Sequence, residues 1–182
     1  MPTHAAFLRA VNLGSTRKAG GEQLRACFEG ADFDEVATFR NSGNVVFAAA
    51  KPGGVAALTK RIEKALAADL GFEVPAFVRS AAQVRKIAAQ KPFPPKAVEA
   101  SKGKLQVALL SAKPKAKATK DVLALAGDED LLAIEATELY WLPSGGTQQS
   151  GLDMKAIDAA LGPNTLRTMG TIEQLATKFF SG

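Results

Sequence analysis

The stretch TFRNSGNVVF, residues 38–47, decides the fold, because it joins two apolar runs through a short polar turn. The runs, at 35–39 and 44–49, are rich in β-branched and aromatic residues, which is typical of neighbouring strands. Gly43 suits the centre of a hairpin, where glycine supplies the positive φ that such turns require. We therefore predict a β-hairpin, and Arg40 and two asparagines exceed what a turn needs.

The sequence on either side of this hairpin alternates between helical and strand periodicity. Apolar residues spaced three and four apart predict helices at 20–31 and 53–71. Short apolar runs predict strands at 4–11 and 74–80. The resulting order is βαββαβ, the ferredoxin-like split arrangement.

The same order recurs after a helix near 81–90 and the Pro- and Lys-rich stretch 91–104, where we expect no regular helix. The further predictions are strands at 105–111, 131–136, 138–143 and 165–169 and helices at 119–126, 151–162 and 171–180. We predict an α/β (α+β) protein of two ferredoxin-like βαββαβ halves, produced by an internal duplication, plus a C-terminal helix. The expected domains are a first half at 1–80, a helix and Pro/Lys-rich linker at 81–103, and a second half at 104–182.

Composition narrows the class of protein. The 182 residues contain one cysteine, so no intramolecular disulfide can form. The first residues lack the basic region of a signal peptide, and no apolar run reaches the ~18 residues of a membrane span, so we expect a soluble cytoplasmic protein and no membrane partner. Charge is uneven: residues 91–120 hold eight lysines and one acid, whereas 121–182 hold nine acids and three bases.

Several short motifs together resemble the bacterial family called domain of unknown function 1697. They are Phe7-Leu8-Arg9, Asn12 with Gly14, Leu24-Arg25, Val36, Thr38-Phe39, Ser42-Gly43-Asn44-Val45-Val46-Phe47, and the stretches 72–80, 91–93 and 165–175. The resemblance implies a two-part, ferredoxin-like α/β architecture and supplies no assigned activity.

The chain departs from this family's pattern at several positions. Ala10 and Ser15 stand where the family usually has glycine, and Gly21 stands where it usually has methionine. The stretch 146–153 lacks an expected arginine, and Met169-Gly170 replaces a usual Trp-Asn pair.

Common catalytic and metal-binding constellations are missing from the sequence. His4 is the only histidine, and Cys27 lies on the apolar stripe of a predicted helix, so we expect Cys27 in the core and no Cys- or His-based zinc site. The stretch 145–153 lacks the Lys-Ser/Thr of a phosphate loop, and we expect no cofactor. Ser150 and Asp153 instead resemble a capping box that begins a helix.

The predicted topology gives the polar turn a second interpretation. Strands one and two of a βαββαβ unit run parallel, so the loop 10–18 and the hairpin 40–44 meet at one edge of the sheet, beside the start of the first helix. Helix amides and nearby cations favour anions such as phosphate. The candidate ligand-binding residues are Arg9, Asn12, Lys18, Arg40, Asn41, Ser42 and Asn44. Turn chemistry alone also explains the asparagines and glycine.

Three function classes therefore remain open. The first is binding of a phosphate-bearing anion, either a nucleotide or nucleic acid, with Lys113, Lys115 and Lys117 as candidate nucleic-acid contacts. The second is a small-molecule enzyme that uses Arg, Asn and Lys to orient an anionic substrate. The third is a protein-interaction module that uses the acidic C-terminal region. Tyr140 and Trp141 are consecutive in a predicted strand, so one is expected in the core and the other on the opposite face.

Overall fold

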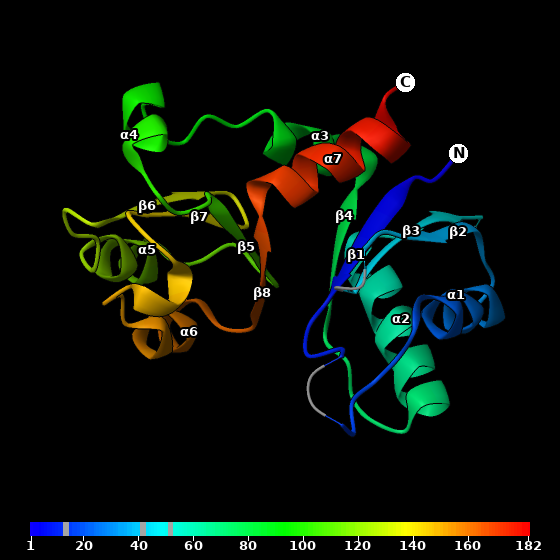
Figure 1. Ribbon diagram of the computed structural model, residues 1–182. Helices are drawn as coiled ribbons and strands as arrows, with labels where there is room; N and C mark the ends of the chain where they lie inside the picture. The colour runs from blue at the N-terminus through cyan, green and yellow to red at the C-terminus, as the bar shows by residue number, and fades with distance from the viewer. Residues whose placement is uncertain (13–14, 41–42, 51–52) are drawn as a thin grey trace. The chain divides into compact units, whose positions relative to one another are not determined.

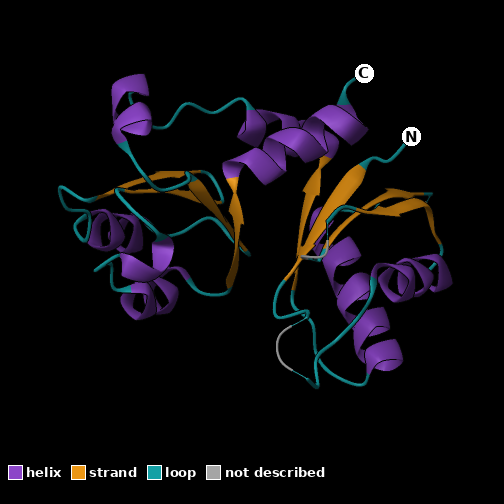
Figure 2. Ribbon diagram, in the orientation of Figure 1, coloured by secondary structure: helices purple, strands orange, loops and turns teal. Residues whose placement is uncertain are grey.

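The computed structural model describes residues 1–12, 15–40, 43–50 and 53–182. Eight strands form two four-stranded sheets, and helices follow the strands in the predicted order (Figures 1 and 2). The first half contains β1 (His4–Leu8), α1 (Gly21–Gly30), β2 (Phe33–Thr38), β3 (Asn44–Ala49), α2 (Val55–Leu70), β4 (Ala76–Ser80) and α3 (Ala81–Ala88). After α4 (Pro95–Ala100), the second half contains β5 (Gln106–Leu110), α5 (Ala116–Leu123), β6 (Asp130–Glu135), β7 (Glu138–Pro143), the 3-10 turn η1 (Thr147–Gln149), α6 (Met154–Leu161), β8 (Asn164–Thr168) and α7 (Met169–Phe180).

Both sheets have the strand order of a ferredoxin-like unit. The orders are β2-β3-β1-β4 and β6-β7-β5-β8, and every neighbouring pair is antiparallel. The predicted fold class is confirmed, since each half is a βαββαβ unit with its two main helices on one face of the sheet (Figure 2).

The two halves repeat each other in detailed register. His4 in β1 lies opposite Phe47 and Ser80, and Gln106 in β5 lies opposite Trp141 and Thr168. Three backbone hydrogen bonds that flank the strands also occur in both halves. Leu8 N–H donates to Gly43 C=O, as Leu110 N–H donates to Thr137 C=O, and Arg9 N–H donates to Pro75 C=O, as Ser111 N–H donates to Pro163 C=O. Ala81 N–H donates to Thr3 C=O, as Met169 N–H donates to Leu105 C=O. This correspondence supports the internal duplication more directly than element order does.

The hydrophobic core of the first half is the larger of the two helix-side cores. It contains sixteen buried residues between the sheet and helices α1 and α2, with Leu58, Ile62 and Leu66 of α2 fully covered. The corresponding cluster of the second half contains six, because α5 and α6 are only eight residues long, whereas α2 has sixteen. The strands of the second half therefore keep partly exposed apolar side chains, including Leu132 and Ile134.

Two local predictions are wrong. The Pro-rich stretch is not free of helix, because α4 begins at Pro95. Proline is tolerated in the first turn of a helix, where its missing N–H has no intrahelical partner. The helix α6 is capped by Asp153, whose carboxylate accepts the Ala156 N–H at 3.0 Å. Ser150 lies outside that cap and donates to Asp130 Oδ1 at 2.8 Å.

The chain forms two compact units. One consists of Met1–Lys86 with Gln174–Gly182, and the other of Ile87–Glu173. The last turns of α7 therefore belong with the first sheet. Within the described ranges, no helix is long and apolar enough to cross a membrane.

Candidate functional site

The polar hairpin and the loop after β1 lie at one edge of the first sheet, as the topology requires. Leu8 N–H donates to Gly43 C=O at 2.8 Å and joins the end of β1 to the hairpin. The Asn44 side chain is 1 % exposed, and its amide donates to Phe39 C=O at 3.0 Å. Asn44 thus has a structural role in closing the turn.

Asn12 organises the loop that leads to α1. Its backbone N–H donates to Arg17 C=O at 2.7 Å, and its side-chain oxygen accepts the Ala19 N–H at 3.1 Å. These bonds close the loop on itself and deliver Ala19 to a buried position just before α1. Asn12 therefore stabilises this loop through both its backbone and its side chain.

Backbone conformations with positive φ gather at this edge. Ala10, Asn12 and Arg40 have φ of 60°, 64° and 58°, and Gly43 has 72°. Residues other than glycine seldom adopt such values, which cost on the order of 1–2 kcal/mol each. The value at Ala10 gives a physical reason for the glycine that the family pattern usually has there.

A cavity of about 300 Å³ opens between these segments. Its lining residues come from the loop, the start of α1, the end of β2 and the hairpin: Asn12, Ala19, Gly20, Gly21, Leu24, Thr38, Arg40, Gly43 and Asn44. A Cβ on Gly21 would lie 2.9 Å from Thr38 Oγ1, so the backbone of α1 closely approaches the end of β2. The absence of a side chain at Gly21 leaves the helix backbone as part of the cavity wall.

The amino end of α1 has donors that the helix itself does not use. Leu24 N–H makes an intrahelical bond to Gly20 C=O, and the preceding amides of the first turn have no such partner. Gly20 at the N-cap provides no side-chain cap. The exposed Glu22 in the first turn is the one negative charge there, and it offsets part of the helix dipole.

Arg40 lines the cavity and also contacts α7. Its guanidinium donates to Gln174 Oε1 and lies 5.5 Å from the centre of the Phe39 ring. Phe39 in turn meets Phe179 edge to face at 6.0 Å, and the Lys178 ammonium lies 5.8 Å from the Phe39 ring. The last turns of α7 thus place a second cation beside the Phe39 ring.

Comparison with known proteins places the chain in a family. Residues 1–140 match the family described as protein of unknown function (DUF1697). The chain belongs to this family. The match covers every residue that lines the cavity, whereas Gln174 and α7 lie beyond it.

A solved structure shares the fold over the whole length of the chain. It is the conserved bacterial protein SP0830 from Streptococcus pneumoniae, which is 17 % identical, with a TM-score of 0.75 over 98 % of this chain and 99 % of that one. At this identity the likeness shows the fold alone. No curated protein matches the chain.

The cavity of this family member includes some of the predicted ligand-binding residues and not others. Asn12, Arg40 and Asn44 line it, whereas Arg9 and Lys18 are exposed and do not. Asn41 and Ser42 lie outside the described residues. The role of the whole set in ligand binding stays a prediction.

Sequence reasoning missed other contributors to this edge. Thr38, Gly20 and Gly21 line the cavity. In the sequence, Thr38 has the pattern of an ordinary strand residue, and the two glycines have the pattern of a flexible segment before a helix. Gln174 lies 134 residues from Arg40 and carries no local signal. Only the packing of α7 on the first sheet identifies it.

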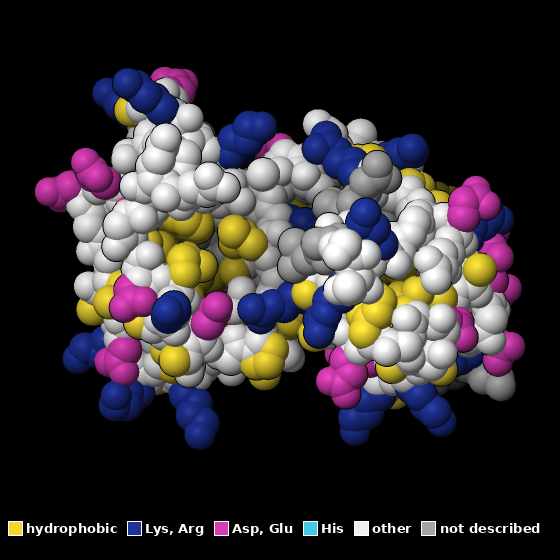
Figure 3. All heavy atoms as spheres, turned by 60° about the horizontal axis from the view of Figure 1, so that its bottom comes forward, with side chains coloured by type: hydrophobic (Ala, Val, Ile, Leu, Met, Phe, Trp, Pro, Cys, Tyr) yellow, Lys and Arg dark blue, Asp and Glu magenta, His cyan; other side chains and the backbone are white. Residues whose placement is uncertain are grey.

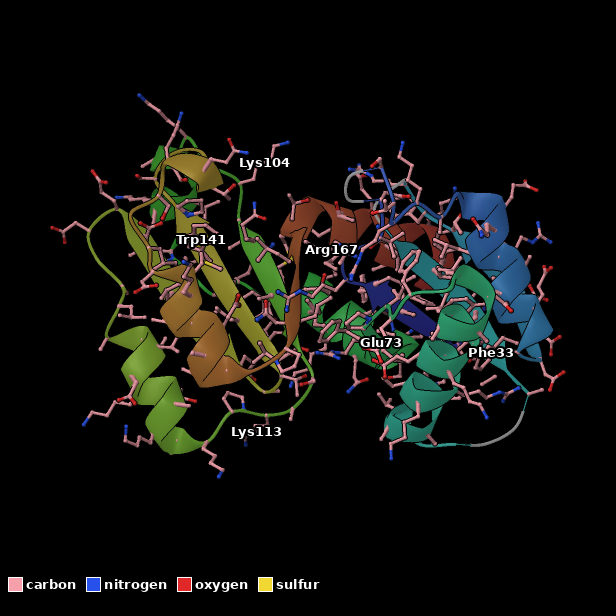
Figure 4. All side chains as sticks on the ribbon, turned by 90° about the horizontal axis from the view of Figure 1, so that it is seen from below. Phe33, Glu73, Lys104, Lys113, Trp141 and Arg167 are labelled. Atoms are coloured by element: carbon pink, nitrogen blue, oxygen red, sulfur yellow. The ribbon has the colours of Figure 1, made fainter. Side chains whose placement is uncertain are left out.

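Two arginines at equivalent positions of β4 and β8 also escaped sequence reasoning. Arg79 is 5 % exposed and donates to Val78 C=O at 3.0 Å. Arg167 donates to Thr165 Oγ1 and Leu166 C=O, and burial lowers the pKa of Arg167 to about 10 (Figure 4). Both continue the duplicated register, since Arg79 pairs with Ala5 and Arg167 with Val107.

The aromatic pair Tyr140 and Trp141 is buried on both faces of β7, at 1 % and 3 % exposure. Trp141 Nε1–H donates to Asp130 Oδ1 at 2.7 Å, and Figure 4 shows Trp141 within the second sheet. The two rings lie on opposite faces of β7, as expected, and neither is exposed. The central strands β5 and β7 are buried on both faces, which a strand pattern alone does not reveal.

Cys27 is 3 % exposed, and its expected place in the core is confirmed. Burial, together with the nearby Asp69, raises the pKa of the Cys27 thiol from 9.0 to about 11. Because the thiolate is the reactive form, we expect a disulfide reagent at pH 8 to label native protein about a hundredfold more slowly than denatured protein. Labelling rates with and without guanidinium chloride test this, and equal rates would contradict it.

The three candidate nucleic-acid contacts lie at the start of α5. Lys115 is the N-cap, Lys117 pairs with Asp121 at 2.7 Å, and Lys113 precedes them on the exposed loop (Figure 4). On the face drawn in Figure 3, Lys and Arg side chains are spread over the surface and do not form one patch. A nucleic-acid role for these lysines stays a prediction.

Replacing Lys113, Lys115 and Lys117 with glutamine tests that role. If these lysines contact phosphates, the plot of log affinity for duplex DNA against log salt concentration should be less steep for the variant than for the wild type. The magnitude of the slope should decrease by about 2, because each phosphate contact contributes ~0.9 and Lys117 is already paired with Asp121. Fluorescence anisotropy at several salt concentrations measures it. A wild-type protein that binds no DNA at low salt would contradict the prediction.

Proposed function

We propose that the cavity between the loop after β1, the start of α1 and the hairpin binds a phosphate-bearing anion, with a nucleotide or a nucleic-acid phosphate as the ligand. The observation that carries the proposal is the meeting of two kinds of donor in one cavity. These are the first-turn amides of α1, which lack intrahelical partners, and the guanidinium of Arg40. Helix amides favour anions through hydrogen bonds and the helix dipole, and a guanidinium adds charge-assisted bonds.

The surrounding residues support an anion over a cation or an apolar ligand. Thr38 adds a hydroxyl to the wall, and the lining residues that the structure describes include no acid. Among the described lining residues, Leu24 is the one large apolar side chain, so their apolar contacts are few. Glu22 is close enough in sequence to oppose an anion, but it is exposed and does not line the cavity.

Strained backbone also marks the site. Three residues other than glycine adopt positive φ within the two segments that frame the cavity. Such strain persists where the surrounding structure enforces it, and it is common at ligand-binding sites. Here it directs Asn12 and Arg40 to the same cavity.

Titration calorimetry with inorganic phosphate, pyrophosphate and a nucleoside triphosphate tests the proposal directly. Saturable binding that strengthens with phosphate number and weakens with salt is expected, because the donors are cationic or carry partial positive charge. Sodium chloride at matched ionic strength is the control for nonspecific ionic effects. Heats that do not exceed those of the control for any of the three anions would contradict the proposal.

A further inference from the structure

The two sheets end in edge strands that differ in how they resist the addition of another strand. In the first sheet, the pairing of β2 with β3 shifts register between Asp34 and Ala37, and Glu35 has φ of 51°. Such a bulge bends the edge and removes the regular row of donors and acceptors. Charged side chains at Asp34 and Glu35 protect this edge further.

The corresponding edge strand of the second sheet lacks these protections. All six residues of β6 pair with β7 in unbroken register, from Asp130 opposite Pro143 to Glu135 opposite Glu138. The four central residues, Leu131 to Ile134, are all apolar and half-buried. Figure 1 draws β6 at the end of its sheet, with no strand beyond it.

The outward backbone groups of β6 can be identified from its neighbours. Asp130 C=O accepts Gly127 N–H at 3.1 Å on the outer side, whereas Glu129 C=O accepts Ser144 N–H on the β7 side. Because backbone groups alternate along a strand, the N–H and C=O of Leu132 and Ile134 also point outward. Outside the sheet ladder, the described part of the chain provides no backbone partner for them.

The charged residues of the segment that contains β6 have one sign. Residues 127–138 contain five acids and no base. Asp128 and Glu129 are exposed before β6, and Glu135 is exposed at its end. A strand added to β6 would therefore have acidic side chains near both of its ends.

We propose that the edge of β6 binds an extended peptide segment that is apolar in the middle and basic at both ends, by adding it as a fifth strand. The backbone of Leu132 and Ile134 would supply the hydrogen bonds, and Glu135 with Asp128 and Glu129 would select the basic ends. A second copy of the chain fits poorly. Two β6 strands would place acids against acids in either orientation, which is unfavourable for opposed strand positions.

The experiment uses two synthetic peptides and the full chain. The first is Lys-Val-Thr-Val-Thr-Val-Lys with blocked ends, and the second replaces both lysines with glutamate. In amide hydrogen exchange and ¹H–¹⁵N spectra, the basic peptide is expected to slow exchange at Leu132 and Ile134 at least tenfold, and the acidic peptide is expected to leave both unchanged.

Three variants make the test specific. Ile134→Pro removes an outward donor at an edge position where proline is tolerated, and it should abolish binding. Glu135→Lys should weaken binding about fivefold, the size of one lost exposed charge pair. Glu173→Lys, the same charge change on α7, should leave binding unchanged.

The outcomes separate the alternatives. If Ile134→Pro does not fold, the wild-type protein is titrated instead with a basic peptide that carries N-methyl groups on alternate residues. Failure of this peptide to bind supports strand addition. Equal binding of the acidic peptide, no binding of the basic peptide at millimolar concentration, or self-association of the protein through β6 would overturn the proposal.

Discussion

Gly43→Val is expected to reduce the free energy of unfolding by about 3 kcal/mol, the largest loss of stability from any single substitution at the candidate site. Gly43 has φ of 72°, which a β-branched residue resists. A Cβ at this position would also lie 3.1 Å from Leu8 Cβ and 3.2 Å from Leu8 C=O. Leu8 is 2 % exposed and closely packed in the core, so moving it aside would disrupt that packing and reduce stability.

Urea denaturation followed by circular dichroism measures this loss of stability. Substitutions at two other glycines serve as controls that separate backbone strain from steric overlap. Gly71 has φ of 77° with no atom within 4 Å of an added Cβ, so Gly71→Val reports backbone strain alone. Gly151 has open space and no positive φ, so Gly151→Val should change stability by less than ~0.5 kcal/mol. A Gly43→Val variant as stable as Gly151→Val would show that the hairpin does not depend on this turn.

Arg40→Ala is expected to weaken binding of the proposed phosphate-bearing ligand by about 1.5–3 kcal/mol, roughly ten- to a hundredfold in affinity. The guanidinium is the one cationic group among the described residues that line the cavity. The fold should lose less than about 1 kcal/mol, because Arg40 is exposed and gives up only its bond to Gln174 and its contact with Phe39. Ala10 already adopts a similar positive φ, so alanine can be accommodated in this conformation.

Calorimetric titration and thermal melting on the same preparations separate the two effects. Arg25→Ala removes an equal charge from the exposed side of α1, where Arg25 pairs with Glu29, and should leave affinity within about twofold. Gln174→Ala removes the tether and keeps the guanidinium, so it should retain most of the affinity. If Arg40→Ala binds each anion as tightly as wild type does, or melts as low as Gly43→Val, the site is a structural turn.

Local patterns in the sequence determined the element order and most of the fold. The period of apolar residues in 53–71 predicts α2, and the alternation of strand and helix signals predicts both βαββαβ units. The topology alone also places the loop after β1 beside the hairpin, because parallel strands end at the same edge. Asn12, Arg40 and Asn44 could therefore be predicted to meet at that edge.

The tertiary structure decided which of those polar residues share a cavity, and which have partners elsewhere. Arg9 and Lys18 lie on the same loop as Asn12, but neither lines the cavity. Gln174 reaches Arg40 only because α7 returns to the first sheet, and Tyr140 and Trp141 are both buried because β7 is covered on both of its faces. A sequence pattern records the period with which a segment repeats its apolar residues. It does not record which distant segment covers a face, because that depends on contacts between side chains far apart in the chain.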